Sequence, residues 1–263
     1  MKKLIYQVYV GNNSNLYDHC TASVKRYADK IGAEYKVQKQ PILKIAPDVN
    51  NKKSNRSRDS YMKHGGFLPI YEKENAFAYL GEYDQVAIID ADVYIRKSAP
   101  DIFAEVGNEY DFGAVLENAM PLNPKYRAKV RGYSKGQFRP LENEGKFPKR
   151  DAEYEFMNMG VMVLNKSIVP FFEGQTPEQF LRRPEFKRFV DGEGDWKWST
   201  DQTLLNYWIR KYPIRYKCMD WRWNGMYTAI DKINECHFVH FILRSKLPSK
   251  GENLDRIMKI LNE

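Results

Sequence analysis

Residues 85–94 read Gln-Val-Ala-Ile-Ile-Asp-Ala-Asp-Val-Tyr, and the organisation of the chain follows from them. Four consecutive apolar residues without a turn former predict a short, fully buried strand. The strand leads directly into two aspartates separated by one residue. In an extended chain, residues two apart point to the same face, so the carboxylates of Asp90 and Asp92 can converge on one object.

Two carboxylates at the end of a buried strand repel each other unless a positive group lies between them. A divalent cation meets this need, and oxygen ligands suit Mg²⁺ or Mn²⁺. A strand that simply ends in solvated acids explains the same pattern. The spacing alone leaves both interpretations open, so the rest of the chain has to decide between them.

The composition indicates a folded protein with a positive charge. A chain of 263 residues suffices for one large domain or two small ones, and its 43% hydrophobic content excludes a disordered polymer. The 42 Lys and Arg exceed the 34 Asp and Glu, which favours anionic partners such as nucleic acid, a membrane surface or phosphorylated small molecules. No segment is typical of a nucleic-acid-binding tail, so we expect no specific nucleic-acid partner.

The cysteines and the N-terminus bear on the cellular compartment. Three cysteines without close pairing argue against a disulfide framework and fit a reducing compartment. The apolar run 4–10 is short and has no small-residue cleavage site, so we interpret it as a strand, not as a signal peptide. No run approaches about 18 apolar residues, so we expect at most peripheral membrane contact and a cytoplasmic protein.

The beginning of the chain predicts a parallel α/β sheet. A strand over 4–10, a helix over 16–31 stopped by Gly32, and a strand over 35–37 form its opening unit. Ligands bind such sheets at the carboxyl ends of the strands, where residues 11–13 and the two aspartates lie. We expect further strands at 111–116, 156–165, 214–217 and 237–243, and helices at 71–80, 101–103, 199–210 and 254–261.

Four further segments connect or follow these elements, and each has its own prediction. We expect loops at 40–60 and 192–198 and one basic amphipathic helix at 177–190. Residues 120–152 hold four prolines, three glycines and nine Lys or Arg, which predicts a long loop. Such a loop is either a functional lid or a solvated insertion.

Two local patterns have a structural explanation and a functional one. In the helix 199–210, Ser199 and Gln202 have the spacing of a capping box. Gly160, near the start of the strand 156–165, marks either close approach by a ligand or a bulge.

His237 and His240 suggest a metal pair, but residues three apart on a strand face opposite ways, so at most one of them reaches a given site.

Four blocks, in order, resemble the GT-A class of nucleotide-sugar-dependent glycosyltransferases, and most closely family 8, which includes glycogenin-like and bacterial galactosyltransferase-like enzymes. Asp90-Ala91-Asp92 resembles the metal-binding Asp-x-Asp block, and 158–165 resembles the Asn-x-Gly-Val strand. Residues 201–206 resemble the Asp-Gln-Asp-x-Leu-Asn block. His240-Phe241 followed by Lys246 resembles the His-Phe-x-Gly-x-x-Lys-Pro-Trp tail, and Trp223-Asn224 resembles the aromatic-Asn pair before it. The resemblance spans about residues 5–247.

The chain departs from the family pattern at three places. Thr203 replaces the second Asp of the third block. Leu243 stands where the tail has Gly, a residue that lets the backbone approach a diphosphate closely. Leu247-Pro248 replaces Pro-Trp.

The resemblance implies one α/β domain over 1–263 with the GT-A (Rossmann-like) fold, whose central sheet is mixed, mainly parallel and flanked by helices. It implies a nucleotide-sugar-binding half, 1–117, and an acceptor-binding half, 118–263. The basic segment 120–152 would then be a lid on the acceptor side.

The resemblance also implies site roles. Asp90, Asp92 and His240 would hold Mn²⁺ or Mg²⁺, with Asp90 alternatively reaching the ribose or the sugar. The donor would be a nucleoside-diphosphate sugar, with UDP as the expected carrier, and the acceptor a hydroxyl of a glycan or glycoconjugate. The implied donor-site residues are Val10, Gly11, Asn12, Asn13 and Tyr17 for the base and ribose, Ala91 for the ribose, Lys73 for phosphate or sugar, Lys246 for the diphosphate and Asn158 for sugar or acceptor.

Asp201 and Gln202 would lie beside the anomeric carbon. The family favours transfer with retention. Transfer with inversion would need a carboxylate base, for which Asp201, Glu153 and Glu155 are candidates.

Other classes explain less of the sequence. A haloacid-dehalogenase-like phosphohydrolase also has a strand ending in Asp-x-Asp, but near its start, and with a small residue where Tyr94 stands. A sugar-nucleotide pyrophosphorylase would have a Gly-rich, Arg-containing loop after the first strand. A non-catalytic carbohydrate-binding protein explains the charge and the five tryptophans, but not two aspartates converging with a His and a Lys.

Overall fold

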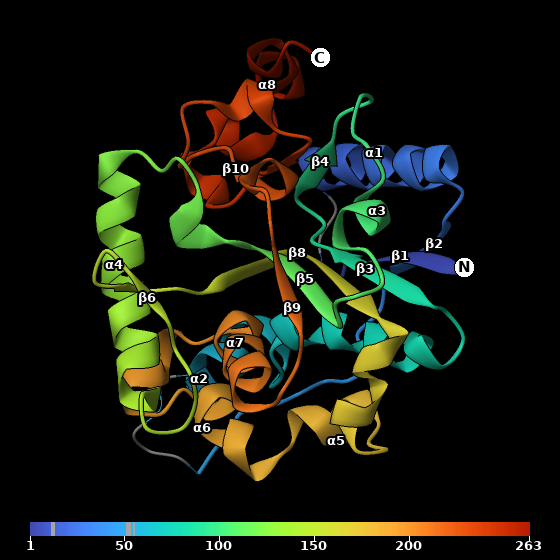
Figure 1. Cartoon of the computed structure of the whole chain (residues 1–263). Coiled ribbons are helices and arrows are strands. Elements are labelled where there is room, and N and C mark those ends of the chain that lie inside the picture. The colour runs from blue at the N-terminus through green and yellow to red at the C-terminus, as the bar shows by residue number, and fades with distance from the viewer. Residues whose placement is uncertain (12–13, 51–53, 55) are drawn as a thin grey trace.

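A six-stranded sheet runs through the middle of the molecule in the order β2-β1-β3-β8-β5-β9 (Figure 1). The fold is taken from a computed structural model that describes residues 1–11, 14–50, 54 and 56–263. The strands of this sheet are β1 (Lys3–Val8), β2 (Glu34–Gln38), β3 (Gln85–Ile89), β5 (Phe112–Leu116), β8 (Met157–Asn165) and β9 (Tyr216–Met219).

The direction of the strands makes the sheet mixed and mainly parallel. β1 is parallel to β2 and β3, and β5 is parallel to β9. Only β8 among these six is reversed, and it is antiparallel to both of its neighbours. Every residue of β8 is buried, as expected for a central strand with a continuous apolar sequence. The predicted α/β class and mixed sheet are therefore confirmed.

Helices cover both faces of this sheet (Figure 1). α1 (Asn15–Ile31) and α3 (Ile102–Val106) lie on one face. α5 (Pro177–Leu181), α6 (Lys187–Asp191) and α7 (Asp201–Lys211) lie on the other, together with α2 (Arg56–His64) and the 3₁₀ segment η1 (Pro69–Gly81). α4 (Pro124–Phe138) stands beside the sheet, and α8 (Leu254–Leu261) is the last helix. One large apolar core fills the space between these layers.

A second, three-stranded sheet connects the two aspartates to the C-terminal part of the chain. It consists of β10 (Gly225–Met226), β11 (Phe238–His240) and β4 (Val93–Ile95). β11 is antiparallel to β4, with His240 opposite Val93. This pairing brings His240 next to Asp92, although 148 positions separate the two residues in sequence. A short hairpin, β6 (Lys149–Arg150) and β7 (Glu153–Tyr154), lies apart from both sheets.

The prediction of a long loop at 120–152 is wrong, because α4 occupies nearly half of it. Asn123 caps the helix by accepting a hydrogen bond from the backbone N–H of Tyr126, and Pro124 occupies its first turn. The other prolines lie outside α4, so they bound the helix rather than break it. The many Pro, Gly, Lys and Arg residues of the segment are typical of a loop, so its composition did not indicate the helix.

Three other boundary predictions are also wrong. The single helix at 177–190 is broken into α5 and α6 at Pro184, which cannot donate a helical hydrogen bond. The predicted loop at 40–60 contains the start of α2, and 192–198 contains a 3₁₀ segment over Gly194–Trp198. The remaining predicted strands and helices are present, with ends shifted by a few residues, except that 71–80 is a 3₁₀ helix.

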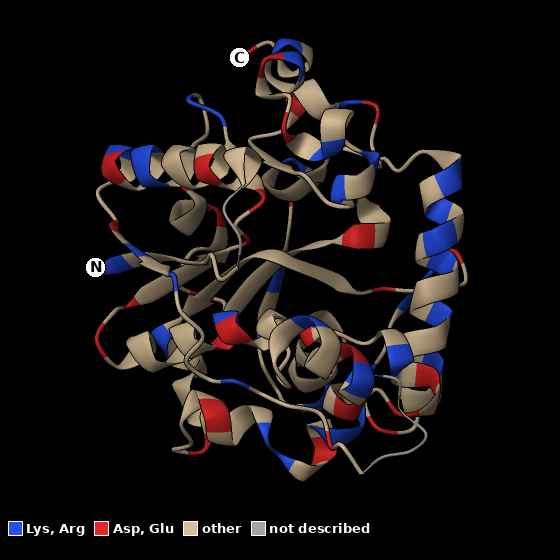
Figure 2. Cartoon of the chain, turned by 180° about the vertical axis from the view of Figure 1, so that it is seen from behind, with Lys and Arg blue, Asp and Glu red and all other residues tan. Residues whose placement is uncertain are grey.

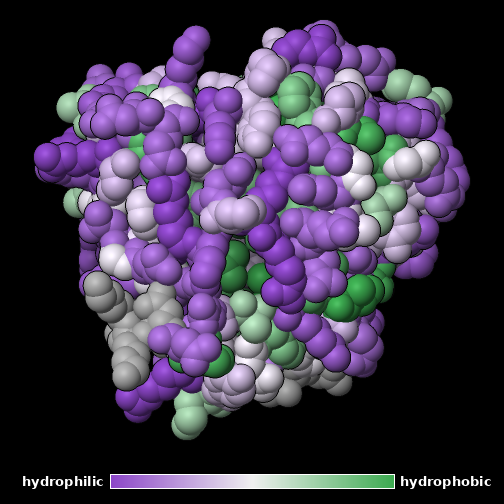
Figure 3. Space-filling model, turned by 90° about the horizontal axis from the view of Figure 1, so that it is seen from below, coloured by the Kyte–Doolittle hydropathy of each residue, from purple (hydrophilic) through white to green (hydrophobic). Residues whose placement is uncertain are grey.

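The lower face of the molecule is mostly polar. Seen from below, hydrophilic side chains cover most of this face and hydrophobic ones show between them (Figure 3). Among the described helices, none combines the length and the apolar character that crossing a membrane requires.

Candidate active site

A cavity of about 390 Å³ opens at the carboxyl ends of β1 and β3. This is the edge at which ligands bind in open α/β sheets. Ten of the residues predicted for metal, donor or catalysis line this first cavity, namely Val10, Tyr17, Lys73, Asp90, Ala91, Asp92, Asn158, Asp201, Gln202 and His240. They come from six separate regions of the chain.

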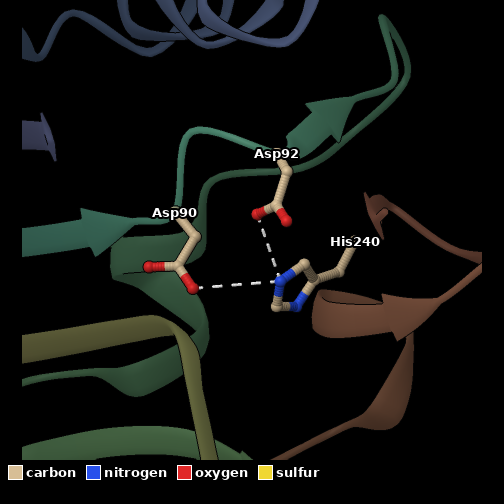
Figure 4. Close-up of side chains that lie close together, drawn as sticks. All are labelled: Asp90, Asp92 and His240. Carbon is tan, nitrogen blue, oxygen red and sulfur yellow. Dashed lines mark ion pairs between the residues drawn. The ribbon is translucent and has the colours of Figure 1, made fainter. Parts of the chain in front are cut away.

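Asp90, Asp92 and His240 converge on one point of this cavity. Figure 4 shows both aspartates on the segment between β3 and β4 and His240 on β11, with one ring nitrogen facing both carboxylates. The Nε2 atom of His240 lies 3.3 Å from Asp92 Oδ1 and 3.8 Å from Asp90 Oδ2. One ligand atom from each residue lies within 4.8 Å of the others.

The side chains of this cluster influence one another's charge. Burial disfavours the charged imidazolium of His240, but Asp92 and Asp90 outweigh it and raise the pKa of His240. Burial likewise opposes ionisation of Asp92, but His240 lowers its pKa. Without another cation, the imidazolium neutralises part of the carboxylate charge.

A chain of three amide and carboxylate groups fixes the orientation of the His240 ring. Its Nδ1 atom lies 2.9 Å from Asn224 Oδ1, and Asn224 Nδ2 donates to Asn158 Oδ1 over 2.8 Å. Asn158 Nδ2 donates to Glu117 Oε2 over 2.8 Å. Because both amides donate toward the carboxylate, Nδ1 of His240 carries the proton and donates to Asn224. Nε2 is thereby directed at the aspartates.

Gly160 leaves the room that the His240 ring occupies. A Cβ atom at position 160 would lie 2.2 Å from His240 Cε1 and 2.6 Å from its Nδ1. The register between β5 and β8 also shifts here, and Gly160 O accepts a hydrogen bond from Asp90 N over 2.8 Å. The strand irregularity predicted as one explanation of this glycine is therefore present. The atoms that approach Gly160 closely belong to His240, not to a ligand.

Lys73 connects the aspartate pair to helix α7. Its Nζ lies 2.9 Å from Asp90 Oδ1, 2.9 Å from Asp201 Oδ2 and 2.8 Å from the carbonyl oxygen of Met159. Burial alone would lower the pKa of Lys73, but Asp201 and Asp90 raise it well above its usual value. Burial raises the pKa of Asp201 despite this partner. Lys73 is thus a buried, paired cation rather than a solvated helix lysine.

The start of α7 positions Asp201 and Gln202. The N-cap is Thr200, whose hydroxyl accepts from the backbone N–H of Gln202, so the predicted cap at Ser199 is wrong by one residue. The Ser199 hydroxyl donates instead to the carbonyl oxygen of Phe189. The Gln202 side-chain oxygen accepts from Met159 N over 3.3 Å, which connects the helix to β8.

Other predicted site residues lie outside this cavity. Gly11 and Lys246 do not line it, and Asn12 and Asn13 fall outside the described residues. Glu153 pairs with Arg131 over 3.0 Å and Glu155 pairs with Arg150 over 2.9 Å, away from the cavity. Of the three carboxylates considered as bases, Asp201 alone lines it.

A second cavity, of about 430 Å³, adjoins the first along α4. Four residues line both cavities, namely Asn158, Thr200, Gln202 and Ile242. Two molecules, one bound in each cavity, would therefore meet at Gln202. Glu117 lines only the second cavity, and its burial raises its pKa.

The residues present fit a divalent cation. Two carboxylates and one imidazole nitrogen form a mixed oxygen and nitrogen donor set, which suits Mn²⁺ or Mg²⁺. The contact with Asn224 resembles the outer hydrogen bonds that orient metal-binding histidines.

Sequence reasoning missed two residues of this site. Glu117 directly follows β5, and no local pattern distinguishes it from a surface acid. The sequence indicates Asn224 only through the resemblance of Trp223-Asn224 to an aromatic-Asn pair, and the contact of Asn224 with His240 depends on the parallel pairing of β10 with β11. Only tertiary structure brings these residues to the histidine.

The fold can be compared with solved structures. A glycosyltransferase involved in the glycosylation of the major capsid of PBCV-1 is 12% identical, with coverage of 97% of this chain and 100% of that one and a TM-score of 0.52. Mouse xyloside xylosyltransferase 1 in its apo form is 13% identical, with coverage of 94% and 100% and a TM-score of 0.51. The chain has the GT-A glycosyltransferase fold.

At these identities the GT-A likeness concerns the fold, and the activity has to be argued from the site. No protein-family model and no curated protein matches the sequence. Both similar structures are glycosyltransferases, so the comparisons do not favour the phosphohydrolase alternative.

Proposed function

We propose that the chain is a metal-dependent glycosyltransferase that moves a sugar from a UDP-sugar to a hydroxyl of a glycan or other glycoconjugate, with retention at the anomeric carbon. The observation that carries the proposal is the convergence of Asp90, Asp92 and His240 at the ligand-binding edge of a GT-A sheet. A buried Lys and a second, adjoining cavity complete a site for two substrates.

The first cavity is the proposed donor site. Val10 and Tyr17 line the wall beside β1, where the base and ribose would lie, with Ala91 near the ribose. Asp90, Asp92 and His240 would hold Mn²⁺ or Mg²⁺, which when bound offsets the charge of the leaving diphosphate. Gly11, Asn12 and Asn13 adjoin this wall in sequence. In this proposal, residues 1–117 form the nucleotide half and 118–263 the acceptor half.

The chain's own residues organise the transfer. Lys73 and Asp201 are mutually paired beneath the donor, and Gln202 and Asn158 lie where the two cavities meet. The bond from the anomeric carbon to the diphosphate oxygen breaks, and the acceptor oxygen bonds to that carbon. The acceptor proton passes to the leaving diphosphate. Preorganised polar groups at this junction stabilise the charge that develops.

Retention is proposed from the resemblance to family 8, and it agrees with the contacts of the two described carboxylates nearest the junction. Glu117 accepts a hydrogen bond from Asn158 over 2.8 Å. Asp201 is the one candidate base that lines the first cavity, and it is already held by Lys73 over 2.9 Å. Inversion would require a base beside the acceptor hydroxyl. Measuring the anomeric configuration of the product by NMR tests this part of the proposal separately.

The test is a thermal-shift screen of nucleotide sugars with and without Mn²⁺. A true donor at 100 times its Kd stabilises the fold by about 2.7 kcal/mol, which for a domain of this size raises Tm by roughly 5–10 °C. We expect the shift to require both Mn²⁺ and a UDP-sugar and to be lost in Asp92→Asn. Asp29→Asn, an exposed aspartate on α1, is the matched control. Unchanged shifts in Asp92→Asn would overturn the proposal.

A phosphohydrolase would behave differently. Its first aspartate forms an aspartyl-phosphate during turnover, whereas glycosyl transfer forms none. Absence of a trapped acyl-phosphate on Asp90, together with release of UDP from the donor, is the result we expect.

A further inference from the structure

The second cavity has the chemistry of a sugar-binding site. Its lining includes Tyr126 and Tyr133, both half-buried, and Val130 between them on α4. Tyrosine offers an apolar ring face and a polar hydroxyl, which together suit the apolar and hydroxylated faces of a sugar ring. Glu117 adds a buried hydrogen-bond acceptor next to Asn158.

The helix that forms one wall of this cavity is strongly basic. α4 carries five Lys or Arg and no acid, and Figure 2 shows blue segments along its length. Arg127 and Arg131 face Glu153, which lies 3.9 and 3.0 Å from their side-chain nitrogens. These two charges are therefore compensated within the protein.

Lys125 and Lys129 are not compensated in this way. They are four residues apart, so they lie on the same side of the helix. Lys246 lies beside Lys129, whose contact lowers the pKa of the Lys246 amine, with a smaller effect from Lys125. Among the described residues, no Asp or Glu is within ion-pair distance of any of these three lysines.

Three neighbouring cations without a counter-charge repel one another. An anion bound between them removes this repulsion and gains favourable charge-assisted hydrogen bonds. Lys129 also lines the second cavity, so an anion held by the lysine cluster is continuous with a ligand in that cavity. A ligand with a negative group at one end would therefore stabilise this cluster.

We infer that the second cavity binds the acceptor and that this acceptor is a sugar bearing an anionic group, a phosphate or a carboxylate, held by Lys125, Lys129 and Lys246. The inference rests on the proposed glycosyl transfer. The sugar ring lies along Tyr126 and Tyr133, and its reacting hydroxyl lies at Gln202, where the two cavities meet.

Binding of three probe sugars to the full chain, in the presence of UDP and the diamagnetic ion Mg²⁺, tests this inference. The probes are a neutral methyl glucoside, the matching methyl glucuronide and glucose 6-phosphate, and binding is measured by saturation-transfer NMR with competition. We expect at least one anionic probe to bind about 10-fold or more tightly than the neutral one at low salt, with this preference decreasing as salt rises. Comparison of the two anionic probes distinguishes the carboxylate from the phosphate.

Substitutions of lysines on α4 test which side chains cause the preference for the anionic probe. Lys125→Ala with Lys129→Ala should reduce binding of the preferred anionic probe by about 10-fold while binding of the neutral probe stays within about 2-fold. Lys135→Ala removes a charge from the same exposed helix, ten residues from Lys125 or about 15 Å, and should leave the preference intact. All these side chains are exposed, so the variants are expected to fold.

Three results would overturn the inference: equal binding of neutral and anionic probes, binding of none of them, or an anionic preference that survives in the double variant. A thermal shift with a UDP-sugar and Mn²⁺ is recorded separately on the same protein preparations. A normal donor shift without anionic preference counts against this inference alone. Absence of any donor shift counts against the proposed function.

Discussion

The Nδ1 atom of His240 lies 2.9 Å from the side-chain oxygen of Asn224, and this contact determines which ring nitrogen faces Asp90 and Asp92. Asn224 is in turn held by Asn158, and Asn158 by Glu117. The protein itself thus orients the histidine. Such preorganisation matters because a ring free to rotate loses affinity for the metal.

Replacing Asn224 by Ala should therefore weaken Mn²⁺ binding without removing a ligand. Outer partners of metal-binding histidines typically contribute about 10–100-fold in affinity, and we expect a loss in this range. Calorimetric titration with Mn²⁺ measures it. Asn224→Asp, which keeps an acceptor for His240 Nδ1, should retain more affinity than Asn224→Ala. Equal affinity in the wild type and Asn224→Ala would show that the ring needs no such support.

Gly160→Ala should displace His240 and abolish Mn²⁺ binding. The new Cβ would lie 2.2 Å from His240 Cε1, so the ring has to move. The control is Gly132→Ala on α4, where a Cβ meets no atom within 4 Å and where Ala favours the helix by about 0.5–1 kcal/mol. Circular dichroism checks the fold and Mn²⁺ titration checks the site. Full binding by Gly160→Ala would mean that the backbone, not the histidine, moves aside.

Removing Lys73 should destabilise the fold more than removing it together with Asp201. Lys73→Met leaves two carboxylates facing each other, one of them buried, which typically costs about 3–5 kcal/mol. Lys73→Met with Asp201→Asn removes the unpaired buried charge and should recover part of that loss. Urea unfolding of both single variants and the double variant gives the coupling energy. If the losses in unfolding free energy of the two single variants add up to the loss of the double variant, the contact between Lys73 and Asp201 contributes no coupling energy.

The sequence was sufficient for the parts of the fold that depend on local patterns. The buried run before Asp90, the helix ending at Gly32 and the C-terminal helix are all present as predicted. α4 was missed because its prolines lie at its ends and its apolar stripe is weak. The break at Pro184 was missed because basic residues continue the helical pattern on both sides of it.

The candidate site also has a part that local sequence patterns predict and a part that only the tertiary structure brings together. Asp90 and Asp92 were recognised because one strand places both on one face. The contacts of Lys73 with Asp201 and of His240 with Asn224 join segments 128 and 16 residues apart, and no spacing rule encodes them. Tertiary packing determines these partners. Sequence patterns therefore predicted the site residues, but not the hydrogen bonds and ion pairs between them.

A different ion pair makes the stability depend on pH. Burial alone would raise the pKa of Asp111, but hydrogen bonds from Arg215 and Ser167 outweigh it and hold that pKa below its usual value. Because the folded-state pKa is depressed, this stabilisation is fully present above about pH 4–5 and is lost as the pH falls through the folded-state pKa.

Asp111→Asn should therefore be less stable than the wild type by about 1 kcal/mol at pH 7, a modest value because the Arg215 side chain is 59% exposed. The difference should shrink as the pH is lowered toward 3. Urea unfolding at several pH values measures it. A difference that stays constant with pH would mean that the charge of Asp111 contributes nothing.

Leu243, which stands where the resembled family pattern has Gly, adopts the left-handed conformation, with φ +56° and ψ +55°. For an L-residue this conformation costs about 1–2 kcal/mol, a cost that glycine avoids. The Leu243 side chain is 44% exposed, so replacing it removes little packing. We expect Leu243→Gly to be more stable than Leu243→Ala by about 1 kcal/mol, the reverse of the usual order of these residues in a helix or strand. Thermal unfolding of the two variants measures this difference. If Leu243→Ala is the more stable variant, residue 243 does not hold the left-handed conformation in solution.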